Sequence, residues 1–134
     1  MKSKFNNLIS LPALLVVVLV SGCAFDLADV KYAPAQFQSI SEAGRAFTLS
    51  TNMKLTGMPC GYGRELRKNT RWESSGSMAQ GEVFRSRDQI LTLECSNVYE
   101  AYLVVRDGRL MGFFLPVQQG FVGLAEPVVL PVNP

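Results

Sequence analysis

Residues Tyr99–Leu115, which read YEAYLVVRDGRLMGFFL, carry the strongest structural signal in the chain. Two β-rich runs flank Asp107-Gly108, a dipeptide that favours a tight hairpin turn because both central residues of that turn take positive φ. With a two-residue loop, the expected cross-strand pairs are Val105 with Leu110, Leu103 with Gly112 and Ala101 with Phe114. The returning strand is apolar on both faces, so we expect it at the centre of a sheet that is covered on both sides.

Shorter strand signals lie on both sides of this hairpin. Alternation over Asp88–Cys95 places Leu91, Leu93 and Cys95 on one face of a strand and Ile90, Thr92 and Glu94 on the other. Further short strands are expected at Ala46–Thr51, Phe121–Leu124 and Val128–Val132. After residue 22, no stretch of useful length has the apolar period of a helix. The pattern predicts an all-β fold, a small antiparallel sandwich or a partly open barrel.

The N-terminal apolar run has the layout of a secretory signal peptide. Lys2 and Lys4 precede the run Leu8–Val20, and small residues follow it. As a helix the run spans about 20 Å, which is shorter than the roughly 30 Å hydrocarbon core of a membrane. We therefore expect residues 1–22 to be a cleaved signal helix.

The end of this run resembles the lipobox of bacterial lipoproteins. In Val20-Ser21-Gly22-Cys23, an apolar residue and two small residues precede a cysteine. The resemblance implies cleavage before Cys23, a diacylglyceryl thioether on its thiol, and a further acyl chain such as palmitate, which together anchor a protein stably. Ala24 rather than Asp follows the cysteine, which in that family implies the outer membrane, with the domain facing the periplasm. The inner membrane and the cell surface stay open as alternatives.

The expected organisation is a signal peptide over 1–22, an acylated N-terminus and tether over 23–44, and a β-domain over 45–134. The whole chain has 13 Lys plus Arg and 11 Asp plus Glu. Removing Lys2 and Lys4 with the signal peptide makes the mature chain neutral. Binding to a nucleic-acid backbone requires a surplus of cations, so we expect no nucleic-acid partner.

Three cysteines occur in the chain, and the resemblance assigns Cys23 to the lipid anchor. In an exported chain, the other two, Cys60 and Cys95, most simply form one disulfide. Closing a loop of about 36 residues is expected to stabilise the fold by roughly 4 kcal/mol. Two buried free thiols are the alternative.

The chain contains no histidine, which excludes several kinds of active site. Ser-His-Asp and Cys-His catalysis, His-ligated zinc and ordinary haem ligation all need that side chain. The acidic residues are scattered, and their spacing does not predict a converging pair for hydrolysis. We therefore expect no catalytic residues, no metal, no cofactor and no enzymatic activity.

One segment carries a weak binding signal. Residues 64–72 hold four cations and the only tryptophan of the chain, a combination that suits anionic sugars, phosphates or a protein hot spot. The candidate binding residues are Arg64, Arg67, Lys68, Arg71 and Trp72. A solvated polar hairpin with Trp72 partly packed is the alternative. Ser74–Gly81 follows as an expected flexible loop and a second contact surface.

These observations favour a lipid-anchored envelope lipoprotein that acts as a non-enzymatic binding or scaffold module, with the membrane and an envelope protein as its partners. One alternative is an inhibitor or immunity protein against a wall-degrading enzyme such as lysozyme. Membrane-bound lysozyme inhibitors are similar in being small, anchored, disulfide-linked β-barrels, and Ser75-Gly76 resembles their inserted loop. The other alternative is a small carrier of lipid or glycan, which needs an apolar cavity.

Overall fold

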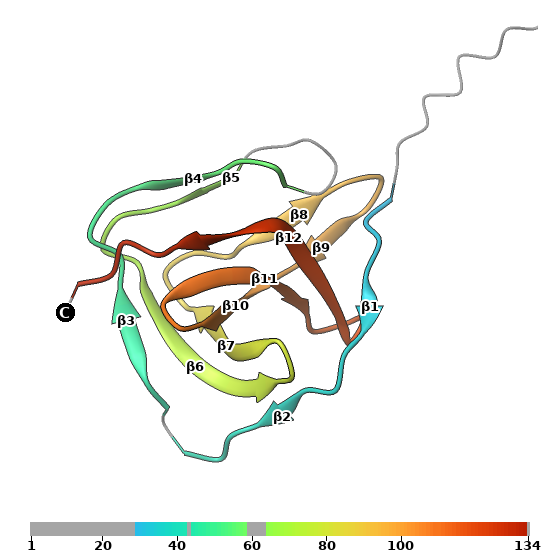
Figure 1. The fold of residues 1–134 in the computed structure, drawn as a ribbon, viewed down its shortest axis with the longest axis horizontal. Coiled ribbons are helices and arrows are strands. Elements are labelled where there is room, and N and C mark those ends of the chain that lie inside the picture. Colours follow the sequence, from blue (N-terminus) through green and yellow to red (C-terminus); the bar gives the residue numbers. More distant parts are fainter. Residues whose placement is uncertain (1–28, 43, 59–63, 134) are drawn as a thin grey trace, which may run out of the picture.

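The computed structural model describes residues 29–42, 44–58 and 64–133. This part of the chain is all-β without a helix, and a curled open sheet forms a half-barrel (Figure 1), which confirms the predicted fold class. The strands are β1 (Ala33–Pro34), β2 (Gln38–Ser39), β3 (Ala46–Thr48), β4 (Met53–Leu55), β5 (Arg64–Leu66), β6 (Arg71–Met78), β7 (Gly81–Ser86), β8 (Thr92–Glu94), β9 (Val98–Glu100), β10 (Tyr102–Arg106), β11 (Arg109–Leu115) and β12 (Gly120–Val129). Within these described residues, no helix has the length and hydropathy needed to cross a membrane.

The β10–β11 hairpin has the predicted turn, but the pairing of its strands beyond the turn differs from the prediction by one residue. Asp107 and Gly108 take φ values of 51° and 73°, and Val105 pairs with Leu110 as expected. A β-bulge then inserts Met111, so the next pairs differ from those expected. The observed pairs are Val104 with Gly112, Leu103 with Phe113 and Tyr102 with Phe114. The expectation was wrong beyond the turn because a bulge adds one residue to one strand without a matching residue in its partner.

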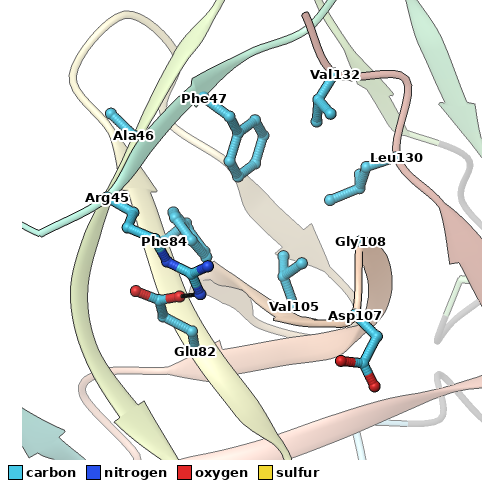
Figure 2. A pocket seen from close by; sticks show the side chains of 10 residues that line it. All are labelled: Arg45, Ala46, Phe47, Glu82, Phe84, Val105, Asp107, Gly108, Leu130 and Val132. Carbon is cyan, nitrogen blue, oxygen red and sulfur yellow. Dashed lines mark hydrogen bonds and ion pairs between the residues drawn. The ribbon is translucent and has the colours of Figure 1, made fainter. Parts of the chain in front are cut away.

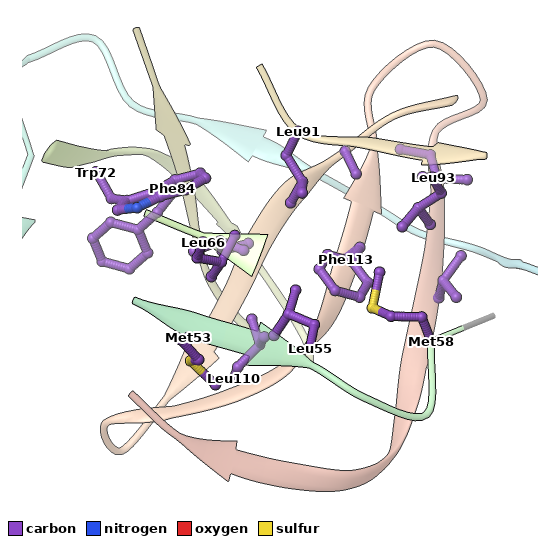
Figure 3. Packing of buried hydrophobic residues seen from close by; sticks show 14 of the residues in the cluster. Met53, Leu55, Met58, Leu66, Trp72, Phe84, Leu91, Leu93, Leu110 and Phe113 are labelled. Carbon is purple, nitrogen blue, oxygen red and sulfur yellow. The ribbon is translucent and has the colours of Figure 1, made fainter. Parts of the chain in front are cut away.

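The central sheet runs in the order β12–β11–β10–β7–β6, with neighbouring strands antiparallel. Its first face packs against the two-stranded ribbons β4–β5 and β8–β9, which contribute Leu55, Leu66 and Leu93 to a large apolar core (Figure 3). Its second face carries a smaller core. On β11, Phe113 belongs to the first core and Phe114 to the second. The expectation that this strand is central and covered on both faces is therefore confirmed.

A segment that we call the N-terminal strap, residues 29–42, covers the second face. Its β1 pairs with β12 at one edge of the central sheet, and its β2 pairs with β6 at the other edge. Phe37 stacks on Phe114 with ring centroids 4.8 Å apart. Val30 is buried in the first core. Over residues 29–42, these apolar contacts attach part of the segment that we expected as a tether to the domain.

The start of the strap is fixed to β9 by a side-chain contact. The hydroxyl of Tyr99 donates a hydrogen bond to Asp29 Oδ1 at 2.7 Å, and this bond is the largest cause that lowers the pKa of Asp29. The same bond raises the pKa of Tyr99. The pair places the entry of the strap beside the β8–β9 ribbon (Figure 1).

The C-terminal part of the chain forms one long strand instead of the two expected short ones. β12 continues through Pro127. Leu110 of β11 pairs with Val128 and Gly112 pairs with Gly123, so the residues of β12 between these two pairs have no paired residue in β11. Beyond β12, Val132 forms a bridge with Leu49, and Ser50 N–H donates to Pro131 O at 2.8 Å. The C-terminal segment therefore lies beside the extension of β3 (Figure 1).

Candidate binding pocket

The structure places the candidate residues of segment 64–72 in separate roles. Arg64 Nη2 forms an ion pair with Glu94 and lies 3.3 Å from Thr92 Oγ1, which joins β5 to β8. Arg71 Nε lies 3.0 Å from Glu73 Oε1. Two of the predicted cations are thus bound to carboxylates of the domain itself.

Arg67 and Lys68 do lie together, in the turn before β6. Arg67 Nη2 donates to Asp88 O at 2.9 Å, and the Lys68 amide donates to Asn52 Oδ1 at 2.7 Å. Both residues line a shallow pocket of about 240 Å³ that also contains Asp88. An acidic side chain inside this pocket weakens its attraction for anions.

Trp72 does not belong to any of these surfaces. Only 1% of it is exposed, and it lies in the first core beside Phe84 (Figure 3). A partner of the folded domain cannot reach a side chain in this position, and the burial agrees with the alternative in which Trp72 is packed. Alternation of Arg71, Trp72 and Glu73 along β6 was the signal in the sequence, since it turns Trp72 to the face opposite its charged neighbours.

Residues Ser74–Gly81 are not the flexible loop that we expected. They form the end of β6, its turn and the first residue of β7. Gly76 is buried under the strap, where its missing Cβ leaves room for the carbonyl oxygen of Gln38 and the ring of Phe37. Ser75-Gly76 is therefore not an inserted loop of the kind found in lysozyme inhibitors.

The predicted lipidation and disulfide sites fall largely outside the described residues. Cys23 and Cys60 both lie there. Cys95 is half-buried and packs against the first core. Met58 and Leu93, each two residues before one of the two cysteines of the predicted disulfide, belong to the same core (Figure 3). The disulfide stays a prediction, and the packing of its flanking residues is compatible with it.

Sequence reasoning missed the pocket drawn in Figure 2. Its volume is about 290 Å³, and it opens between β3, β7, the β10–β11 turn and the C-terminal segment. Its lining consists of Arg45, Ala46, Phe47, Glu82, Phe84, Val105, Asp107, Gly108, Leu130 and Val132. These residues come from four distant parts of the chain, so no local sequence motif predicts the pocket.

The interior of the pocket is apolar and its rim is charged (Figure 2). Phe47 and Phe84 meet edge to face with centroids 4.9 Å apart. At the rim, Arg45 forms an ion pair with Glu82, while Asp107 stands at the opposite side of the opening. The pocket thus offers an apolar floor with one excess negative charge at its mouth.

The ion pair determines the charge state of Glu82. Burial raises the pKa of this carboxyl, but hydrogen bonds from Arg45 and Ser74 outweigh burial, so its pKa lies below the usual value. The same hydrogen bond with Glu82 is the main cause that raises the pKa of Arg45. Both groups are therefore charged at neutral pH.

Comparison of the chain with protein-family models, with curated proteins and with solved structures gives no match. Among the described residues, no three His, Cys, Asp or Glu side chains gather in an arrangement that could hold a metal ion.

Proposed function

We propose that this chain is a lipid-anchored lipoprotein of a bacterial cell envelope, and that its β-domain is a non-enzymatic module that binds a protein partner. Cys23 carries the anchor in this proposal, and the pocket of Figure 2 receives an apolar side chain of the partner. The observation that supports it best is an apolar pocket with a charged rim on the side of the domain away from the start of the strap (Figure 1).

The path of the chain relates the pocket to the anchor. Asp29 is bound to Tyr99 at the β8–β9 side of the domain, and the stretch from Cys23 to Asp29 spans at most about 20 Å. An acylated Cys23 would hold this side near the membrane. The pocket is lined by residues of β3 and of the C-terminal segment, and these elements lie on the other side of the molecule (Figure 1).

The dimensions of the pocket favour a side chain over a whole lipid. Small-molecule sites usually measure about 300 to 1,000 Å³, so about 290 Å³ lies at the lower end. Protein interfaces often bury one large aromatic or aliphatic anchor in such a depression, surrounded by polar contacts. The excess negative charge at the rim favours an anchor that is flanked by Lys or Arg on the partner.

A site-specific photocrosslinker tests this proposal in intact envelopes. Placed at residue 107, on the pocket rim, it should give a discrete adduct with an envelope protein. Placed at residue 117, which is 79% exposed in the β11–β12 connection, it serves as the matched control and should give none. Equal adducts at both positions, or none at residue 107, would count against the pocket as a binding site.

The anchor is tested separately in the same cells. Cys23→Ala should remove the acyl mass from the mature chain and release it from the membrane fraction. A Cys23→Ala chain that fractionates with the membrane like the wild type would contradict the anchor. If the adduct at residue 107 proves to be a wall-degrading enzyme that the protein inhibits, the inhibitor alternative replaces the scaffold.

A further inference from the structure

A second opening, which we call the strap groove, lies between the N-terminal strap and the second face of the central sheet. Its volume is about 610 Å³, well inside the usual range for small-molecule sites. The residues that carry the argument are Phe37, Tyr102, Phe114, Glu73, Arg85 and Arg87. It shares no residue with the pocket of Figure 2.

One row of cross-strand neighbours forms the floor of the strap groove. Tyr102 pairs with Phe114 and Glu73 pairs with Arg85. Leu103 pairs with Phe84, so Tyr102 and Arg85, one residue further along each strand, are also neighbours. Side chains of directly paired residues lie on the same face of a sheet. The row therefore presents two aromatic rings, a guanidinium and a carboxylate side by side.

The aromatic part of the row is fixed in place. Phe37 of the strap stacks on Phe114 with an interplanar angle of 22°, and the Tyr102 ring lies 6.3 Å from that of Phe114. Phe114 is buried, whereas Phe37 and Tyr102 are half-buried and retain exposed ring surface. Strand and strap together thus hold an apolar wall at one end of the groove.

The cationic part of the groove has uncommitted donors. Arg85 and Arg87 lie two residues apart on and just after β7, and both are exposed. Within the described chain, neither makes an ion pair or side-chain hydrogen bond. Two carboxylates also line the groove: Glu73, which already binds Arg71 at 3.0 Å, and Glu42. The pair Glu73–Arg71 is internally neutralised, so the two free guanidiniums outnumber the one remaining carboxylate. A planar guanidinium binds a carboxylate through two parallel hydrogen bonds. Two such groups beside an aromatic wall are suited to a ligand that is both anionic and flat.

Polar groups on the other walls complete the site. Ser39 and Ser41 line the groove with hydroxyls, which can exchange hydrogen bonds with hydroxylated ligands. A sugar ring has an apolar face for Tyr102 and Phe37 and hydroxyls for these serines. A carboxylate on that ring matches Arg85 and Arg87.

We propose that the strap groove binds an acidic saccharide, with its carboxylate on Arg85 and Arg87 and its ring against Tyr102 and Phe37. This site is separate from the protein-binding pocket and does not depend on the lipid anchor. Failure of either proposal therefore leaves the other one unaffected.

Titration calorimetry on the full-length mature protein in detergent tests the site. The probe is an oligogalacturonate, and its methyl ester is the matched neutral ligand. We expect binding of the acid and not of the ester, with an affinity that falls as salt is raised. A glutamate-rich peptide of equal charge is the third ligand, and we expect it to bind at least tenfold more weakly.

Variants locate the site on the protein. Arg85→Gln and Arg87→Gln should each weaken binding of the acid by about tenfold to a hundredfold, as expected for a hydrogen-bonded charged contact. Arg109→Gln is the matched control, because Arg109 is also exposed and lies at the β10–β11 turn outside the groove. All three side chains are exposed, so their thermal midpoints should match that of the wild type.

Several results would overturn the proposal. They are absence of binding by oligogalacturonate at millimolar concentration, equal loss in Arg109→Gln and Arg85→Gln, and stronger binding of the glutamate peptide than of the saccharide. The last of these would make the groove a site for acidic peptides.

Discussion

Replacing Gly76 with alanine tests how closely the strap packs on the sheet. A Cβ at this position would meet the carbonyl oxygen of Gln38 and would lie 2.5 Å from ring atoms of Phe37. Gln38 precedes Ser39, which is the residue of the strap that pairs with Gly76. The backbone at Gln38 therefore cannot move away from the new Cβ without breaking the pairing between Ser39 and Gly76. Either the strap shifts or it detaches from β6.

Both routes have a similar cost in the free energy of unfolding. Overpacking of a tight contact costs about 1–3 kcal/mol. Detachment loses the Phe37–Phe114 stack, worth about 0.5–1.5 kcal/mol beyond the apolar area that it buries. We therefore expect Gly76→Ala to lose about 2 kcal/mol. For a domain of this size, such a loss lowers the thermal midpoint by roughly 8–16 °C.

Gly123→Ala is the matched control for the same chemical change. A Cβ there would lie 3.4 Å from the nearest atom of Phe121, which is an ordinary contact, and Gly123 is exposed in β12. Its stability should stay within about 0.5 kcal/mol of the wild type. Urea denaturation of the two variants measures the difference directly.

Hydrogen exchange distinguishes local from global effects in these variants. The amides of Ala35 and Ile40 donate to Gln119 O and Ser75 O, so detachment of the strap should speed their exchange in Gly76→Ala. The amides of the β10–β11 hairpin should stay protected. Equal stability of the two alanine variants, together with unchanged exchange at Ala35 and Ile40, would refute the packing described for the strap.

Three further predictions concern other parts of the domain. Trp72 Nε1 is buried without a hydrogen-bond partner in the described structure, and Trp72→Phe removes that donor. We expect Trp72→Ala to lower the free energy of unfolding by about 3–5 kcal/mol and Trp72→Phe to lower it by at least about 2 kcal/mol less. Equal losses in urea denaturation would contradict this. The pKa of Asp29 is lowered chiefly by Tyr99, so the stabilisation from this contact is present above the unfolded-state pKa and is lost as the pH falls through the folded-state pKa. The Val30 amide donates to Asp29 Oδ1 at 2.9 Å, so its exchange should show an acid-dependent increase in the wild type that is smaller and begins at higher pH in Tyr99→Phe; identical pH profiles would contradict this. Reduction of the expected disulfide should lower stability by roughly 4 kcal/mol, and mass spectrometry that finds Cys60 and Cys95 both as free thiols in the mature protein would rule the bridge out.

The features that follow from neighbouring residues could be predicted from the sequence. Asp107-Gly108 determines its turn because the turn depends on two residues alone. Alternation over Asp88–Cys95 correctly places Leu91 and Leu93 inside and Ile90 outside, where 80% of it is exposed. These local signals were sufficient for the all-β class.

Features that depend on distant partners could not be predicted. The two-residue strands β1 and β2 are too short to show a period, and only their pairing with β12 and β6 makes them strands. The bulge at Met111 depends on how β11 fits between both of its neighbours. Both openings gather residues from segments far apart in the chain, so their composition is visible only after folding.

The way in which the strap meets both edges of the half-barrel has a consequence for self-association. An open sheet exposes unpaired backbone groups at its edges, which can recruit the edge of another molecule and start aggregation. Here short strands cover parts of β6 and β12, and Pro34 in β1 has no amide hydrogen to offer a further strand. Pro127 interrupts the exposed portion of β12 in the same way. The domain can therefore keep an open sheet without extending that sheet into a neighbouring molecule.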